Sequence, residues 1–285
     1  MNDSNRKFLK KPIFFTTILG IAAVAYLLIF VGNAGNQNPS QSWINHKLAK
    51  EKEVYNELQF DLVDPNMAPE SIQKLAMIGF QIMINTKKLA SDYVGNELAC
   101  TQCHFAGGNT TGGAQGGISL AGVAAKYPAF DPVLGKVIDL SERINNCFLK
   151  SMNGKALPLG SPLMLALVTY LHWISKNLPV YGEIPWLGLT PLSSQMVGDP
   201  VFGKNTYDIY CALCHHENEK RGEIYPPPLW GTGSFNEGAG LNQANKLAAF
   251  IYWNMPYGNQ TPVLSEQQAF DVAAYILSKP RPHLK

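Results

Sequence analysis

Cys100–His104 reads CTQCH and Cys211–His215 reads CALCH, and these two stretches determine the class of fold. In each, two cysteines separated by two residues are followed directly by a histidine. This spacing lets two thiols add to the two vinyl groups of one haem while the adjacent imidazole binds the iron. A zinc site or a disulfide is the alternative for a CxxC pair, but neither requires the histidine. The repeated motif therefore predicts two covalently bound haem c groups, each with its iron.

The segments around the motifs are expected to be helical. Apolar residues recur at helical spacing, β-type alternation is scarce, and one helix should open at 68–71. Two loops rich in glycine or proline, 106–122 and 226–240, are expected to wrap a large flat cofactor. The fold is therefore predicted to be all-α with long loops. The further predicted helices are Val137–Met152, Pro162–Lys176, Val201–Cys214, Asn242–Trp253 and Ser265–Ser278.

The two halves of the sequence repeat. Tyr170 follows His104 by 66 residues in ALVTYL, and Tyr275 follows His215 by 60 residues in DVAAYI. We therefore expect two cytochrome c-type domains, each wrapped round one haem and joined by a proline-bearing linker at 179–196. The predicted divisions are residues 1–34 for a membrane anchor or signal segment, 35–66 for a tether and surface helix (43–64), 67–185 for the first cytochrome c domain and 186–285 for the second.

The N-terminus is typical of a segment that enters a membrane. Four basic residues within Asn2–Lys11 precede Ile13–Val31, which carries no charge. Its length is near the roughly 20 residues needed to span a bilayer and exceeds the roughly 7–15 of a secretory core, which favours an uncleaved anchor. Gly32–Ala34 resembles a cleavage site, so a removed signal peptide and a soluble periplasmic protein are the alternative. Both interpretations export the rest of the chain, to the periplasm of a Gram-negative host.

The charge balance excludes one class of partner. The 285 residues include 23 basic and 21 acidic side chains, a net charge of +2. This gives no electrostatic basis for a nucleic-acid partner.

Each haem iron needs a ligand on its second face. Met255, in NMPYG, follows His215 by 40 residues, and a thioether there would give a His/Met iron suited to electron transfer. The fifth cysteine, Cys147, follows His104 by 43 residues and so occupies nearly the same position in the first half. Met152 is the alternative ligand, in which case Cys147 would be a buried spectator.

Several stretches resemble the di-haem thiosulfate dehydrogenases, which also work as tetrathionate reductases. The resemblance covers roughly residues 71–282. The specific part is a cysteine within ERINNCFLKSMNGKALP, while the second half would fit many cytochrome c domains. The glycine-rich loop 107–117 departs from the expected pattern. The other matching stretches are YVGNELACTQCH, KYPAF, ALVTYLHWIS, GDPVFGKNTYDIYCALCH, PPPLWGTGSFNEGAG, AAFIYWNMPYG and LSEQQAFDVAAYILSKPRP.

The resemblance implies a division of labour between the haems. The first would be the active one, with His104 and a Cys147 thiolate on its iron, and the second an electron relay with His215 and Met255. It also implies that Arg143 and Ser151 contact substrate. The reaction would be interconversion of thiosulfate and tetrathionate, with a cytochrome c or a quinone-linked partner exchanging the electrons. A membrane-tethered electron carrier without a substrate is the alternative function; a di-haem peroxidase is less favoured because no peroxide-cleaving pocket stands out.

The residues near Cys147 suit that chemistry. Both substrates are dianions, so they require positive charge near the thiolate. On a helix through Cys147, Arg143 lies at i−4, Lys150 at i+3 and Ser151 at i+4. A thiolate is also the nucleophile in sulfur exchange, which suggests that Cys147 forms a sulfur adduct with substrate.

Overall fold

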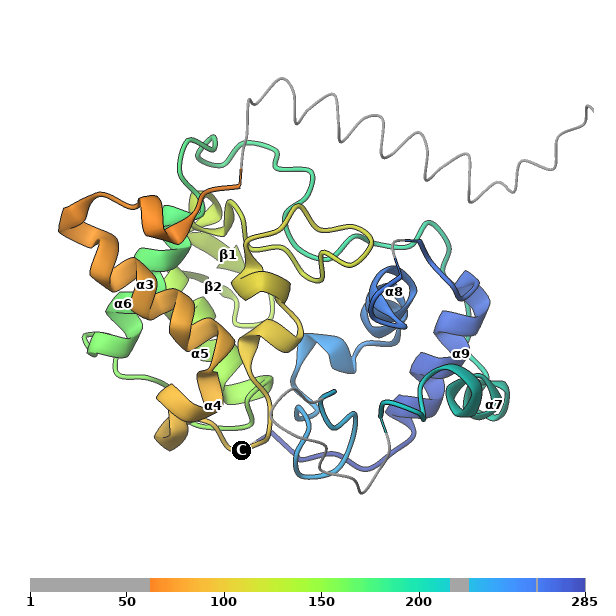
Figure 1. Cartoon of the computed structure of the whole chain (residues 1–285). Coiled ribbons are helices and arrows are strands. Elements are labelled where there is room, and N and C mark those ends of the chain that lie inside the picture. The colour runs from red at the N-terminus through yellow and green to blue at the C-terminus, as the bar shows by residue number, and fades with distance from the viewer. Residues whose placement is uncertain (1–61, 216–225, 260, 285) are drawn as a thin grey trace, which may run out of the picture. The chain divides into compact units, whose positions relative to one another are not determined.

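Two pairs of crossing helices organise the described part of the chain (Figure 1). Helix α3 (Glu70–Ile84) packs on α6 (Pro162–Trp173), and α7 (Pro200–Tyr210) packs on α9 (Glu266–Leu277). Helix α8 (Ala244–Asn254) also packs on α9. The predicted all-α class is thus confirmed, and each half of the sequence contributes one crossing pair.

A glycine brings the helices of each pair close together. A Cβ atom on Gly79 would lie 2.5 Å from Cβ of Tyr170, and one on Gly203 would lie 1.9 Å from the backbone oxygen of Asp271 and 3.0 Å from Cβ of Tyr275. Only glycine permits so close an approach. The two halves therefore repeat the same helix crossing, at the two tyrosines that the sequence repeat aligns.

A short hairpin precedes the helix that carries Cys147. Strand β1 (Ala129–Asp131) pairs antiparallel with β2 (Lys136–Ile138), and α5 (Leu140–Lys150) follows. The predicted helix start at Val137 is therefore wrong. The reason is local. The Asp139 side chain accepts a hydrogen bond from the Glu142 backbone N–H, and the Glu142 side chain accepts one from the Asp139 backbone N–H, which fixes the helix start after the strand.

The other predicted helices are present with shifted ends. Ser161 caps α6 ahead of Pro162, Asp199 caps α7 ahead of Pro200, and Ser265 forms a capping box for α9. Helix α7 ends at Tyr210 rather than Cys214, because the second CxxCH stretch forms turns. The remaining short elements are α4 (Thr86–Leu89) and 3₁₀ turns at Pro65–Met67, Ser91–Tyr93, Cys100–Gln102, Phe105–Gly108, Val123–Lys126 and Gly240–Asn242.

The computed structural model describes residues 62–215, 226–259 and 261–284. The predicted membrane segment 13–31 and nearly all of the predicted surface helix 43–64 lie outside this range. Within it, no helix combines the length and apolar character needed to cross a bilayer.

The main core draws on both halves of the sequence. Ile82, Leu167 and Tyr170 are almost fully buried at its centre, and Phe235 and Ala239 from the second half belong to the same cluster. Burying them together removes apolar surface of both halves from water. The first half therefore depends on the loop 226–241 to complete its core.

Candidate active site

The first CxxCH motif folds into a tight turn. The backbone N–H groups of Cys103 and His104 both donate to the carbonyl of Cys100, at 3.1 and 2.9 Å. Thr86 fixes the start of this turn, because its hydroxyl accepts from the Cys100 N–H at 3.0 Å and lies 3.2 Å from the Cys100 sulfur. Both thiols and the imidazole consequently reach one cavity.

The histidine of each motif is oriented by a backbone carbonyl. Nδ1 of His104 lies 2.7 Å from the carbonyl oxygen of Ile118, and Nδ1 of His215 lies 3.1 Å from that of Pro227. A carbonyl only accepts, so Nδ1 carries the hydrogen and Nε2 keeps the lone pair that a metal needs. Burial lowers the pKa of His104 to about 4 and also lowers the pKa of His215, which keeps both rings neutral at physiological pH.

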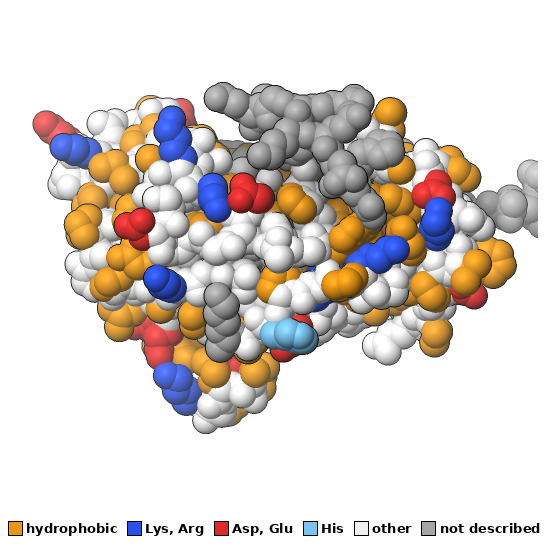
Figure 2. Space-filling view, turned by 90° about the horizontal axis from the view of Figure 1, so that it is seen from below, with side chains coloured by type: hydrophobic (Ala, Val, Ile, Leu, Met, Phe, Trp, Pro, Cys, Tyr) orange, Lys and Arg blue, Asp and Glu red, His pale blue; other side chains and the backbone are white. Residues whose placement is uncertain are grey.

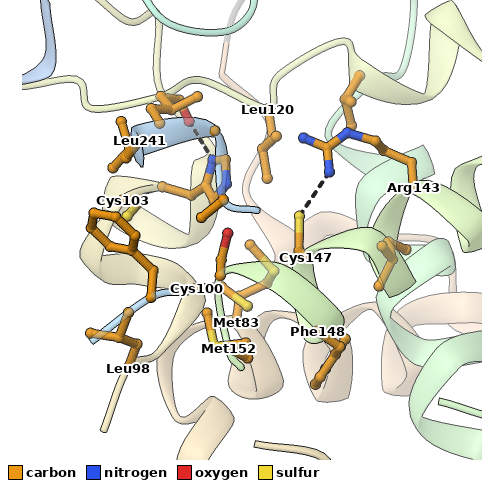
Figure 3. A pocket seen from close by; sticks show the side chains of 18 of the residues that line it. Met83, Leu98, Cys100, Cys103, Leu120, Arg143, Cys147, Phe148, Met152 and Leu241 are labelled. Carbon is orange, nitrogen blue, oxygen red and sulfur yellow. Dashed lines mark hydrogen bonds between the residues drawn. The ribbon is translucent and has the colours of Figure 1, made fainter. Parts of the chain in front are cut away.

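A cavity of about 330 Å³ lies between the first motif and α5 (Figure 3). It contains the three motif residues that would bind haem together with the predicted ligand and substrate residues of α5. Its wall is mostly apolar. The lining residues from the first half are Met83, Leu98, Ala99, Cys100, Cys103, His104, Ile118, Leu120, Val123, Leu140, Arg143, Ile144, Cys147, Phe148, Ser151, Met152, Leu167 and Leu171.

The chemistry of this wall fits a covalently attached haem. Cys100 and Cys103 are free thiols, and burial raises the pKa of Cys100 to about 11 and that of Cys103 to about 12. Within the described ranges, no three or more His, Cys, Asp or Glu side chains are arranged to hold a metal ion by themselves. Two unpaired thiols and a neutral imidazole facing an apolar cavity therefore match haem attachment better than a zinc site.

Cys147 and Arg143 point toward each other at the cavity (Figure 3). The guanidinium Nη1 of Arg143 lies 3.0 Å from the Cys147 sulfur, one helical turn away on α5. The charge of this sulfur, when it is a thiolate, raises the pKa of Arg143 above its already high ordinary value. The pair places a permanent cation on the sulfur that sequence spacing assigns to the first iron.

The C-terminal end of α5 brings Ser151 into the same cavity. Its backbone N–H donates to the carbonyl of Cys147, and its side chain belongs to the lining. Met152, the alternative ligand, also lines the cavity but is 4% exposed and packed in the main core. Lys150 does not line the cavity, so of the three predicted flanking residues the structure assigns only Arg143 and Ser151 to it.

The second half supplies wall residues that sequence reasoning missed. They come from the linker before α7, from the loop that follows the second motif and from the start of α8. Tyr127 beside Arg143 was also missed; burial raises the pKa of Tyr127 and the charge of the Arg143 guanidinium opposes that shift. No local sequence pattern marks such long-range neighbours. The second-half wall residues are Leu189, Phe235, Ala239, Gly240, Leu241 and Lys246.

The second motif is described up to His215. Cys211 is half-buried, burial raises its pKa to about 11, and Cys214 is exposed. Met255 follows α8 directly and is half-buried. Asn254 beside it is fully buried, and its amide is already bonded, because Oδ1 accepts from Gly117 at 2.8 Å and Nδ2 donates to Phe250 at 3.0 Å.

Comparison with known proteins agrees with this site. Residues 92–180 match the SoxA/TsdA cytochrome c domain. The chain is 42% identical over 214 residues to a thiosulfate dehydrogenase from Thiomonas intermedia (strain K12), covering 73% of this chain and 67% of that one. It is 34% identical over 209 residues to a thiosulfate dehydrogenase from Allochromatium vinosum, covering 72% of this chain and 77% of that one.

A solved structure is also similar. The thiosulfate dehydrogenase (TsdBA) from Marichromatium purpuratum in its "as isolated" form superposes with a TM-score of 0.72 at 29% identity, covering 78% of this chain and 50% of that one. The chain thus spans half the length of that relative. Fold and site together define a c-type cytochrome that binds haem covalently. The chain belongs to the thiosulfate dehydrogenase family.

Proposed function

We propose that this protein is an oxidoreductase that interconverts thiosulfate and tetrathionate. Two thiosulfates are joined through sulfur with release of two electrons, or tetrathionate is cleaved with uptake of two. The observation that carries the proposal is the 3.0 Å contact between Arg143 and the Cys147 sulfur, in a cavity that also holds the first CxxCH motif. The thiosulfate dehydrogenases to which the chain is similar support the substrate.

Cys147 is the proposed reacting residue. Its thiolate forms a sulfur–sulfur bond with the terminal sulfur of one thiosulfate, and the two released electrons would be taken up by the two haem groups, one by each. The terminal sulfur of a second thiosulfate then attacks the sulfur that the first one contributed, which releases tetrathionate and restores the Cys147 thiolate. In the reductive direction the same bonds form and break in reverse order.

Arg143 and Ser151 are the proposed substrate contacts. A guanidinium binds oxyanions through two parallel hydrogen bonds and stays charged at all physiological pH values. From α5, Arg143 can hold a sulfonate group of the substrate close to Cys147, and the Ser151 hydroxyl can donate to a second oxygen. The charge of Arg143 also offsets the repulsion between a thiolate and a dianionic substrate.

Two haem groups are proposed, bound at the two CxxCH motifs, in domains spanning 67–185 and 186–285. Each supplies one-electron transfer when bound, so that together they can hold both electrons. His104 and Cys147 are the proposed iron ligands at the first site, and His215 and Met255 those at the second. The His104–Ile118 and His215–Pro227 hydrogen bonds support this, because each leaves Nε2 free to ligate.

The proposed setting is the periplasm, with residues 13–31 as an anchor in the inner membrane. A cytochrome c or a quinone-linked protein is the proposed electron partner. On the face seen in Figure 2, acidic and basic side chains are scattered among apolar ones. Such a mixed surface suits a transient encounter rather than a permanent complex.

Turnover in both directions tests the function. Thiosulfate oxidation with ferricyanide and tetrathionate reduction with reduced viologen are measured for wild type, Cys147→Met and, as a matched control, Met152→Leu. We expect Cys147→Met to keep both haems but lose activity by at least about 100-fold, about 2.7 kcal/mol of transition-state stabilisation. Met152→Leu should stay within about threefold, because it keeps the volume of a packed side chain.

Two outcomes would contradict this assignment. Loss of activity in Met152→Leu, with Cys147→Met still active, would identify Met152 as the essential sulfur. Absence of turnover in the haem-loaded wild type would favour the electron carrier.

A further inference from the structure

The glycine-rich loop of the first half holds the Met255 segment of the second half. The Gln115 side-chain amide donates to the carbonyls of Asn254 and Pro256, both at 3.2 Å. Its oxygen accepts from the Gly258 N–H at 2.7 Å, and its backbone N–H donates to the Trp253 carbonyl at 2.9 Å. One glutamine thus uses both donors and its acceptor on the residues that flank Met255.

A second tie reinforces this contact. The Gly117 N–H donates to Oδ1 of Asn254 at 2.8 Å, and Asn254 is fully buried. Gly117 has φ +63°, and a Cβ atom there would lie 2.7 Å from the Cys103 carbonyl oxygen, so glycine is required for the loop to pass the first motif. The same loop therefore contacts the first haem motif and the residue before Met255.

A residue of the second half, Asn236, in turn holds a segment of the first half. Asn236 is fully buried, and its side-chain amide donates to the carbonyl of Leu149 at 2.8 Å and to Oδ1 of Asn153 at 3.2 Å. Its backbone N–H donates to the carbonyl of Lys150 at 3.2 Å. These partners form the end of α5 just after Cys147, the turn that presents Ser151 to the cavity.

We propose that the two halves cross-brace each other's iron ligands. Gln115 of the first half is a positioning residue for Met255, and Asn236 of the second half is a positioning residue for Cys147 and Ser151. This inference rests on the proposed function insofar as it takes Met255 and Cys147 as ligands. Its consequence is that a substitution in one half changes the haem of the other half.

The chain near Gln115 and the chain near Asn236 are each also held by contacts within their own half. Ile118, which orients His104, donates to the Cys103 carbonyl at 2.9 Å, and Leu120 donates to the Gly108 carbonyl at 2.8 Å. Near Asn236, the chain is fixed by the Gly231 N–H, which donates to the Pro280 carbonyl at 2.8 Å. Loss of either brace should therefore leave the histidine of its own half in place.

The Gln115 variants give the first arm of the test, on the full di-haem protein. In Gln115→Glu a carboxylate oxygen faces two carbonyl oxygens, and Gln115→Ala removes the contacts without that repulsion. We expect the methionine-to-iron(III) absorption of the second haem to weaken and the midpoint potential of that haem to fall. The fall is 59 mV for each tenfold decrease in the ratio of the methionine's affinity for iron(II) to its affinity for iron(III). The electron paramagnetic resonance signal of the thiolate-bound first haem should stay unchanged.

Asn236→Ala gives the reciprocal arm. Here the thiolate signal and the potential of the first haem should change, while the methionine absorption of the second haem persists. Matched controls are Gln73→Ala and Gln267→Ala, each of which removes a glutamine that donates to a backbone carbonyl within its own half. Both controls should leave both haems as in wild type.

The inference requires that each substitution change the haem of the opposite half, whereas a local structural defect would change the haem of the mutated half. Changes confined to the haem of the mutated half, or no change beyond the controls, would overturn the inference. If Asn236→Ala does not fold, the Gln115 arm decides alone. A wild type without the methionine absorption would refute the proposed Met255 ligation and, with it, the role of Gln115, and the Asn236 arm would then decide the inference for Cys147.

Discussion

At the scale of single residues, the site depends on a charge held against a sulfur. Arg143 approaches Cys147 because both lie on one face of α5, four positions apart. Two other lysines of the first half are engaged elsewhere: Lys136 pairs with Glu142 at 2.6 Å, and Lys126 donates to the Gly182 carbonyl. Arg143 is therefore the cation that the structure places against the Cys147 sulfur.

Substitution of Arg143 should weaken substrate binding. A hydrogen bond to a charged group contributes about 1.5–3 kcal/mol, so Arg143→Ala should raise KM for thiosulfate by roughly 10- to 100-fold. Arg143→Lys should recover only part of this loss, because an ammonium cannot make the two parallel bonds. Steady-state kinetics measure both, with Lys150→Ala as a control that removes the same charge from the same helix. An equal rise of KM in Lys150→Ala would show that only the overall positive charge of the helix matters, and not the contact made by Arg143.

At the scale of elements, helix α5 carries the residues of the proposed reaction. Its start is fixed by Asp139 and Glu142 in a reciprocal capping box, and its end is held by contacts to Asn236. Between these two fixed ends lie Arg143 and Cys147. The hairpin β1–β2 sets where the helix begins, which is why the predicted start was misplaced.

Removal of the cap should destabilise this helix. Asp139→Ala is expected to cost about 1 kcal/mol of unfolding free energy, a fall of roughly 2–4 °C in Tm for a unit of this size. Asp139→Asn should retain most of the stability, since its side-chain oxygen still accepts from the Glu142 N–H. The Tm of both variants is measured by thermal unfolding followed by circular dichroism, on samples that contain the same amount of haem per chain. An unchanged Tm in Asp139→Ala would mean that packing alone holds the start of α5.

At the scale of the whole described unit, one helix crossing is used twice and the halves share contacts. Gly79 and Gly203 make the two crossings close, and Phe235 and Ala239 complete a core that belongs mainly to the other half. Hydrogen bonds from Gln115 and Asn236 add to that shared interior. The two halves should consequently unfold together.

Alanine at either crossing tests this cooperativity. Gly79→Ala and Gly203→Ala should each cost roughly 1–3 kcal/mol, because the added methyl group overlaps the facing helix. Gly160→Ala is the control, since a Cβ atom there meets nothing within 4 Å. Calorimetry should show one unfolding transition that moves to lower temperature in both crossing variants. Two separated transitions would show that the halves are thermodynamically independent.

The sequence by itself determined the family and most of the helices, and it predicts the haem attachment residues. The CxxCH spacing and the helix caps are local properties of the chain, and local spacing is readable without a structure. The prediction of Cys147 as an iron ligand rests in the same way on its distance from His104 along the chain.

Only the tertiary structure decided which distant residues support the site. Gln115 and Gly258 are 143 positions apart, and a glutamine in a glycine-rich loop has no pattern that indicates a partner. The wall contributed by Lys246 and Phe235, the carbonyl of Ile118 behind His104 and the place of Tyr127 beside Arg143 likewise follow from packing. The physical reason is that such contacts depend on how folded segments are brought together in space, which residue spacing along the chain does not encode.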